Sequence, residues 1–282
     1  MQSITPSFPS PIQPSTFSDS GLFGPGSITW KVNRELLVLL GGPAAAVLQV
    51  AHPVVARGVA HHSNFQKDTF GRLMRTLDAV YTVAFGPQPE VEKVRQSVAK
   101  IHATVRGADY SAFDPSAQLW VLATLINAST TLYEQFITPL SSLEKDRLLT
   151  ENQAFAQIFG LPPHYVWKTW HDFQNYWLDT LNGPLLASDP TCSKIAHAIL
   201  QPAAPFFFRI SSPILHTLAC ELIPPHLQKR LGIKPSQSKI WILIKYLLPT
   251  LILILPAPLR YAPAYRRAIH RIHQTQRNPK TS

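Results

Sequence analysis

The sequence predicts an all-α protein whose helices pack around a common core. Hydrophobic residues make up 45% of the 282 positions, which is enough to bury one large core. Apolar residues recur at helical spacing, most clearly at Val91, Val94, Val98, Ile101 and Val105. Alternating apolar and polar residues, the pattern of a half-buried strand, form no series along the chain.

Capping and breaking residues set the expected helix boundaries. Thr29 is expected to cap a first helix that Gly41 to Pro43 interrupt, and a second helix from Ala44 to Ala60 breaks near Pro53. Further helical stretches are expected at residues 69–86, with Asp68 or Thr69 as the cap, at 89–107, from 114, from 142, in the aromatic-rich segment 162–181, and at 199–220.

Composition divides the chain into three expected segments. Residues 1–27 are rich in Ser and Pro, carry no Lys or Arg and lack an apolar run, so we expect a disordered leader and no secretory signal. Residues 28–260 form the expected helical domain, and residues 261–282 a basic tail. Because no secretory signal is expected, the protein is expected inside the cell. Cys192 and Cys220 form no CxxC pair, so neither a disulfide framework nor a cysteine zinc site is expected.

Positive charge is concentrated at the C-terminal end. The net charge is +10, and residues 222–282 carry eleven Lys and Arg residues, with no Asp or Glu after Glu221. Because the most apolar run of the chain lies in the same segment, we expect residues 222–282 to make a peripheral membrane contact. A nucleic-acid partner is not expected, since no zinc finger, RNP motif or basic-region zipper is present.

The apolar run itself spans residues 240–259. Twenty helical residues are long enough to cross about 30 Å of hydrocarbon, but Lys245 and Pro249 near the centre make a poor simple span. Three interpretations stay open: a helix packed on the core, an interfacial helix lying in the plane of a membrane, and a true span.

His102 stands out among the eleven histidines because it lies on the apolar stripe of its helix, between Val98 and Val105. Its ring is therefore expected to face the core. A buried imidazole without a partner costs on the order of 1 to 3 kcal/mol, so it needs either a hydrogen bond or a metal. Spacing alone leaves both a hydrogen-bonded core histidine and a metal ligand open.

Other polar residues are weaker candidates. Arg72 and Thr76 are four residues apart on one helix face and could point into one pocket, or form a surface arginine with a buried threonine. His61 and His62 are adjacent, so in a helix they diverge by about 100° and are not expected to chelate one metal together. The chain has no HExxH, di-iron carboxylate, GxSxG or Walker pattern.

Several motifs taken together, in their order and spacing, resemble the catalytic domain of the MpaB and latex-clearing-protein (rubber oxygenase) family over about residues 28–260. The motifs are Gly42-Pro43, Leu48 to Pro53, Val59 to Phe65 with His61-His62-Ser63, Arg72 to Thr76, Ile101 to Gly107, Tyr110 to Pro115, and Trp120-Val121. The resemblance implies a globin-like helical bundle around a haem pocket. It also implies haem b held through His102 as the iron ligand, with Arg72 and Thr76 supporting the haem pocket and its catalysis.

The resemblance further implies dioxygen chemistry that cleaves carbon–carbon double bonds of isoprenoids. Rubber oxygenases carry an acidic residue upstream of the arginine, proposed as the base, but this chain has no Asp or Glu between Glu35 and Asp68. His52, His61 and His62 are alternatives for that role, and an isoprenoid or lipid-like apolar substrate is the expectation. A catalytically silent haem or apolar-ligand binding protein at a membrane surface, and a membrane-surface scaffold without cofactor, are the competing hypotheses.

Overall fold

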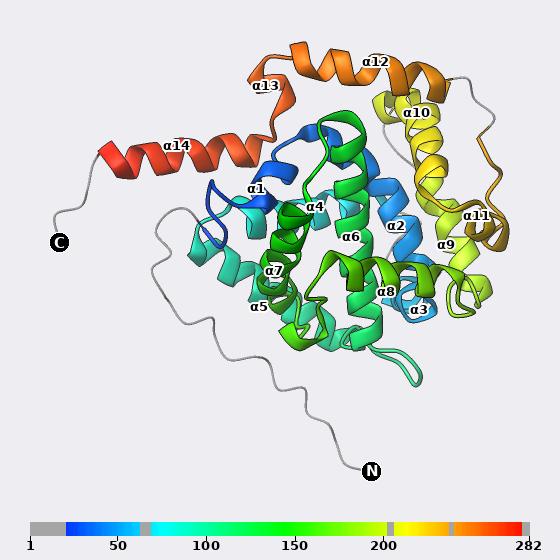
Figure 1. The fold of residues 1–282 in the computed structure, drawn as a ribbon. Coiled ribbons are helices and arrows are strands. Elements are labelled where there is room, and N and C mark those ends of the chain that lie inside the picture. The colour runs from blue at the N-terminus through cyan, green and yellow to red at the C-terminus, as the bar shows by residue number, and fades with distance from the viewer. Residues whose placement is uncertain (1–20, 63–68, 202–205, 237–239, 278–282) are drawn as a thin grey trace.

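The computed structural model describes residues 21–62, 69–201, 206–236 and 240–277, and these residues are helical throughout (Figure 1). The all-α prediction is therefore confirmed. Within the described residues, β-structure is limited to two isolated bridges, one joining Glu35 to Tyr261 and one joining Arg106 to Ser111.

The helices follow one another through short connections. They are α1 (Ile28–Asn33), η1 (Leu36–Gly41), α2 (Gly42–Ala51), α3 (Pro53–His62), α4 (Thr69–Phe85), α5 (Gln88–Thr104), α6 (Pro115–Phe136), α7 (Ser142–Ile158), η2 (Pro163–Tyr165), α8 (Trp170–Asn182), α9 (Pro190–Leu200), α10 (Phe206–Leu222), α11 (Pro225–Leu231), α12 (Ile240–Ile254), α13 (Ala257–Arg260) and α14 (Pro263–Arg277).

Helix α6 runs through the middle of the fold (Figure 1). Asp114 caps it by accepting a hydrogen bond from the backbone N–H of Ala117 at 2.9 Å, and Pro115 takes the first helical position. Buried residues occur on all sides of α6, as expected for a helix that is apolar nearly all round. Trp120, fully buried on α6, donates its indole N–H to the carbonyl of Leu48 at 2.6 Å and so fixes α2 against the central helix.

The expected break near Pro53 is confirmed. His52 ends α2 in an extended conformation, with φ −76° and ψ 123°, because a residue that precedes proline is kept out of the helical region. Among the described residues, no single helix is both long and apolar enough to cross a membrane, and the one arrangement that meets both requirements joins Leu36–Ala51 to Pro53–His62 across a bend of 101°.

The packed structure begins before the expected boundary at residue 28. Residues 1–20 of the expected leader lie outside the described residues, but Ser27 is buried and caps α1 by accepting the N–H of Trp30 at 3.1 Å. Thr29, the expected cap, instead donates its hydroxyl to Glu151 of α7 at 2.7 Å. The cap lies two residues earlier than predicted because the Thr29 side chain is used for a tertiary contact.

The structure also continues beyond the expected boundary at residue 260. Ala268 of α14 is fully buried against Trp30, Ala84 and Phe85, and Arg271 donates to the carbonyl of Phe85 at 2.7 Å. Residues 261–277 are therefore a packed amphipathic helix instead of a separate tail, and only residues 278–282 lie outside the described part.

Candidate functional site

Helices α4 and α5 are joined by the tight Gly86-Pro87 turn and contact each other. Arg72 lies 13 residues before the end of α4, and His102 lies 14 residues after the start of α5. At a rise of about 1.5 Å per residue, both residues lie about 20 Å along their helices from the turn.

The His102 side chain lies on the last turn of α5, under the aromatic ring of Phe113. The two ring centroids are 5.8 Å apart in an edge-to-face arrangement. The backbone of Phe159 lies near enough to the imidazole to raise its pKa, and the buried Nδ1 atom has no hydrogen-bond partner. Gln118 donates to the Phe159 carbonyl at 3.1 Å and to the Ala112 carbonyl at 2.9 Å, which ties this loop to α6.

Burial lowers the pKa of His102, and the backbone of Phe159 partly opposes that shift. The ring is therefore neutral at physiological pH. A neutral imidazole has one ring nitrogen with a free lone pair, and a metal-binding histidine needs such a lone pair.

His102 is half-buried, whereas its spacing predicted a side chain inside the core. Of the five repeating residues on α5, Val91 alone is fully buried, and Ile101 is exposed. The reason is that α5 lies at the edge of the bundle, so its apolar stripe is covered at the start of the helix and thinly covered at its end.

The structure describes the supporting pair only in part. Thr76 is exposed on α4, unlike the buried threonine of the alternative interpretation. The side chain of Arg72 lies outside the described residues. The prediction that both residues face a pocket with His102 therefore stays a prediction.

His52 is the most deeply buried histidine of the described residues and sits at the bend between α2 and α3. Its Nε2 lies 3.2 Å from the hydroxyl of Ser116 in the first turn of α6, and its Nδ1 is buried without a partner. Burial lowers the pKa of His52, and the nearby Asp114 carboxylate partly raises it again.

His61 and His62 meet at one atom, which corrects the expectation that their side chains diverge. His61 Nδ1 lies 2.9 Å and His62 Nε2 3.0 Å from the hydroxyl of Tyr110. The two residues close α3, so Tyr110 of the loop between α5 and α6 can reach between their rings. Both histidines are exposed and already paired with Tyr110.

Residues 106–116 therefore contact all four histidines that the sequence singled out, which are His52, His61, His62 and His102. The contacting residues are Tyr110, Phe113 and Ser116, to which the sequence analysis gave no role. The bridge between Arg106 and Ser111 turns the chain back on itself, and this turn puts the three contacting residues near the start of α6. Only the short spacing between Gly107 and Pro115 signals such a turn in the sequence.

The aromatic-rich segment after Pro162 contributes to the core. Phe173 and Trp167 are buried in the main cluster, and Trp177 stacks on Trp120 with centroids 5.1 Å apart. The side chains of Phe206, Phe207 and Phe208 lie outside the described residues.

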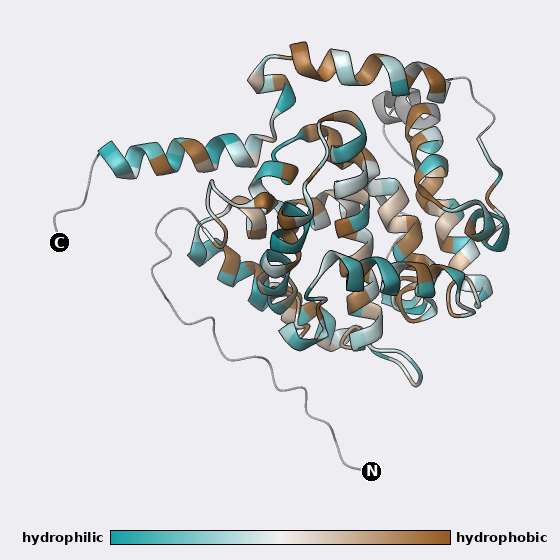
Figure 2. Ribbon diagram, in the orientation of Figure 1, coloured by the Kyte–Doolittle hydropathy of each residue, from teal (hydrophilic) through white to brown (hydrophobic). Residues whose placement is uncertain are grey.

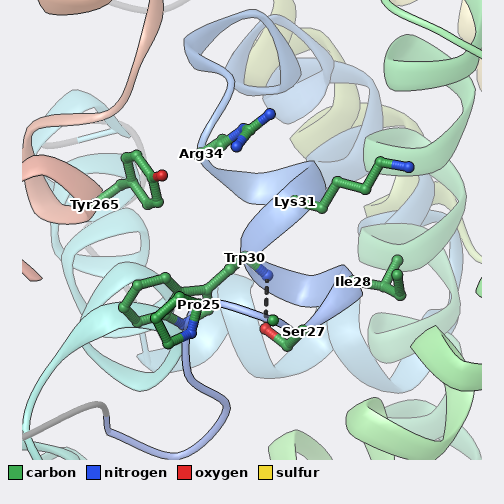
Figure 3. Close-up of a pocket in the computed structure, with 8 residues that line it drawn as sticks. Pro25, Ser27, Ile28, Trp30, Lys31, Arg34 and Tyr265 are labelled. Carbon is green, nitrogen blue, oxygen red and sulfur yellow. Dashed lines mark hydrogen bonds between the residues drawn. The ribbon is translucent and has the colours of Figure 1, made fainter. Parts of the chain in front are cut away.

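The two best-formed pockets lie away from His102. One, of about 270 Å³, is lined by residues of the α1 region and α14, among them Trp30, Lys31, Arg34 and Tyr265 (Figure 3). The other is a shallow surface between Pro263 and His270. Among the described residues, no group of three or more His, Cys, Asp and Glu side chains is arranged to hold a metal ion.

Comparisons with known proteins agree with the motif pattern. The model of the family "ER-bound oxygenase mpaB/B'/Rubber oxygenase, catalytic domain" matches residues 30–251. The chain is also similar to uncharacterized proteins of Mycobacterium tuberculosis and Mycobacterium bovis, each 27% identical over 151 residues, covering 50% of this chain and 59% of the relative. The match thus spans about three fifths of the length of these curated relatives. No solved structure matches the chain.

Proposed function

The chain belongs to the family of the ER-bound oxygenase mpaB/B' and rubber oxygenase catalytic domain, and from this membership we propose that it is a haem b-dependent oxygenase acting on an apolar, isoprenoid or lipid-like substrate. The proposal includes the globin-like arrangement of the helices around the haem pocket. Dioxygen is the co-substrate that an oxygenase of this family requires.

The unpartnered Nδ1 of His102 carries the proposal. A histidine binds a metal through a ring nitrogen whose lone pair is free. His102 Nδ1 is buried without a hydrogen-bond partner, and burial lowers the pKa of the ring, which keeps it neutral. The residues present therefore fit a haem whose iron takes one protein ligand.

Each residue then has a defined task. His102 would hold the iron, and the burial that lowers the pKa of its imidazole would keep the ring neutral. Arg72 and Thr76, on α4, would support the cofactor by hydrogen bonding or charge. Bound haem would supply an open coordination position for dioxygen.

A spectrum of the purified protein tests the proposal. We expect a Soret band and about one haem per chain, both lost in His102→Ala while the helical circular dichroism is retained, since alanine is the best helix former. His216→Ala is the matched control, because His216 is also a half-buried helical histidine but lies on α10. A normal haem content in His102→Ala would overturn the ligand assignment.

A second candidate is a catalytically silent protein that binds haem or an apolar ligand. It is favoured by the lack of any Asp or Glu between Glu35 and Asp68, and by the pairing of His61 and His62 with Tyr110. The measurement that separates the two candidates is product formation from an isoprenoid under oxygen. Haem-loaded protein that gives no oxygen-dependent product supports the silent candidate.

A further inference from the structure

Helix α12 uses only one side of its apolar surface inside the fold. Trp241, Ile244, Leu248 and Ile252 recur at helical spacing and pack against Leu37, Leu132 and Phe136. Trp241 meets Phe136, the last residue of α6, with ring centroids 6.3 Å apart. These four residues of α12 are its inward stripe, and they hold the 15-residue helix on the bundle.

The opposite side of α12 is also apolar and has no partner in the described part of the chain. Its most exposed side chains are Tyr246 at 72%, Leu253 at 63% and Ile254 at 73%, and Ile242, Leu247 and Leu251 are exposed beside them. In Figure 2 the helix lies at the outer edge of the molecule and is hydrophobic along much of its length. Contiguous apolar surface of this kind on a protein marks an interaction site.

The surroundings of this face are positively charged. Lys245 is exposed on α12 itself, and α14 exposes Arg266, Arg267 and Arg277 while its apolar side packs on Trp30 and Phe85. No acidic residue follows Glu221, so neither helix carries a negative charge that would repel an anionic partner. Figure 1 shows α12 and α14 on the periphery of the bundle, joined by α13.

We propose that the outward face of α12, residues 242–254, is a docking surface for an anionic lipid bilayer, in which α12 lies along the membrane plane and the arginines of α14 contact headgroup phosphates. Apolar side chains enter the interface between headgroups and acyl chains, and each nearby Lys or Arg adds electrostatic attraction. This surface does not depend on the proposed oxygenase activity.

Length and packing select this mode among the three that the sequence left open. Fifteen helical residues extend about 22 Å, short of the roughly 30 Å of a hydrocarbon core. The inward stripe holds one side of α12 on the protein, which a spanning segment would have to give up. Full burial against the core is contradicted by the exposed side chains of the opposite face.

Co-sedimentation with vesicles tests the surface. Full-length protein should pellet with vesicles of phosphatidylcholine and phosphatidylserine at ~0.1 M salt, and less at ~1 M salt, where the Debye length falls from about 10 Å to about 3 Å. The variant Leu247→Glu/Leu253→Glu should lower the partition coefficient by about tenfold or more, because two apolar side chains at the interface become charged. Both positions are exposed, so the fold should survive.

The matched control is Leu143→Glu/Leu178→Glu, the same change at two exposed leucines on α7 and α8. Its net charge changes by the same amount as that of the α12 variant, but the outward face of α12 is unchanged. It should therefore pellet within about twofold of the wild type. A second variant, Arg266→Gln/Arg267→Gln, leaves α12 untouched and should weaken binding to anionic vesicles only.

Three results would overturn the proposal. One is the absence of wild-type pelleting with anionic vesicles. Another is an equal loss of binding in the α12 variant and its matched control. The third is a wild-type dimer in light scattering that becomes monomeric in Leu247→Glu/Leu253→Glu, which would assign the face to a second copy of the chain.

Discussion

Replacing Arg260 by Met should destabilise the protein strongly, because it leaves a buried carboxylate without its main partner. Glu35 is fully buried at the start of η1, and Arg260 donates to both of its carboxylate oxygens, at 2.8 and 3.0 Å. The hydrogen bond to Glu35 raises the pKa of Arg260, so the guanidinium stays charged across the physiological pH range. Met keeps the apolar stem of the arginine and removes only the guanidinium.

The expected loss can be sized from the burial of the pair. Removing one partner of a buried ion pair costs about 3 to 5 kcal/mol. Arg34, 3.5 Å from the Glu35 carboxylate, remains as a weaker partner, so the lower end of about 3 kcal/mol is expected. For a chain of this size, that corresponds to a fall in Tm of roughly 6 °C or more, measurable by circular dichroism.

Two further variants make the result interpretable. Arg267→Met removes an exposed arginine of α14 and should leave Tm within about 1 °C. Glu35→Gln/Arg260→Met removes both charges and should recover part of the loss, giving a coupling free energy between the two sites. A Tm for Arg260→Met equal to that of the wild type would refute the view that residues around 260 are an integral part of the domain.

Three other changes have defined outcomes. Arg72→Ala and Thr76→Ala should each lower haem retention without lowering Tm by more than a few degrees, measured by haem content after gel filtration; unchanged content in both would remove their supporting role. Burial lowers the pKa of His52, so the stability that His52 contributes above pH 6.5 is lost as the pH falls from 6.5 toward the lowered pKa. His52→Gln should therefore flatten the fall of Tm between pH 7.5 and 5.5. An unaltered slope of Tm against pH would contradict this. Gly21→Ala should lower Tm, because φ is +72° and an added Cβ would lie 2.3 Å from the carbonyl oxygen of Gly86. Gly26→Ala is the control, since a Cβ added at Gly26 meets nothing within 4 Å. Equal stability of the two variants would mean that residue 21 does not pack as the structure has it.

The helices were predictable because their signals are local. Pro53 breaks its helix for a steric reason that needs no tertiary contact. Capping is less predictable, since Ser27 and Thr29 are both suitable caps and the choice depends on Glu151, more than 120 residues away. The packing of α14 was unpredictable for the same reason. A basic composition looks like a solvated tail, and the burial of Ala268 depends on Trp30, far away in the sequence.

The contacts of the candidate site were not predictable from the sequence. The periodicity of α5 placed His102 on the apolar side of its helix, but the depth of burial depends on where the helix lies in the bundle. Likewise, a divergence of about 100° holds for successive residues inside a helix. His61 and His62 end their helix, and Tyr110, from the loop between α5 and α6, contacts both of them. A local sequence pattern does not show which distant residue a loop places against a helix.

Helix α6 separates the histidine-bearing end of the molecule from the proposed docking surface. Its first turn contacts His52 through Ser116, and the residues just before it lie against His102 through Phe113. Its last residue, Phe136, meets Trp241 on α12, and the 22 residues between these ends extend about 33 Å. A bilayer that holds α12 therefore lies well beyond direct reach of His102, so docking alone does not deliver an apolar substrate to the proposed haem site. Because the two ends share no residue, a change at one should leave the other intact: Leu247→Glu/Leu253→Glu should keep its haem content, and His102→Ala should keep its binding to anionic vesicles. A loss of haem in the surface variant would show that the two ends are coupled through α6, contrary to the distance that separates them.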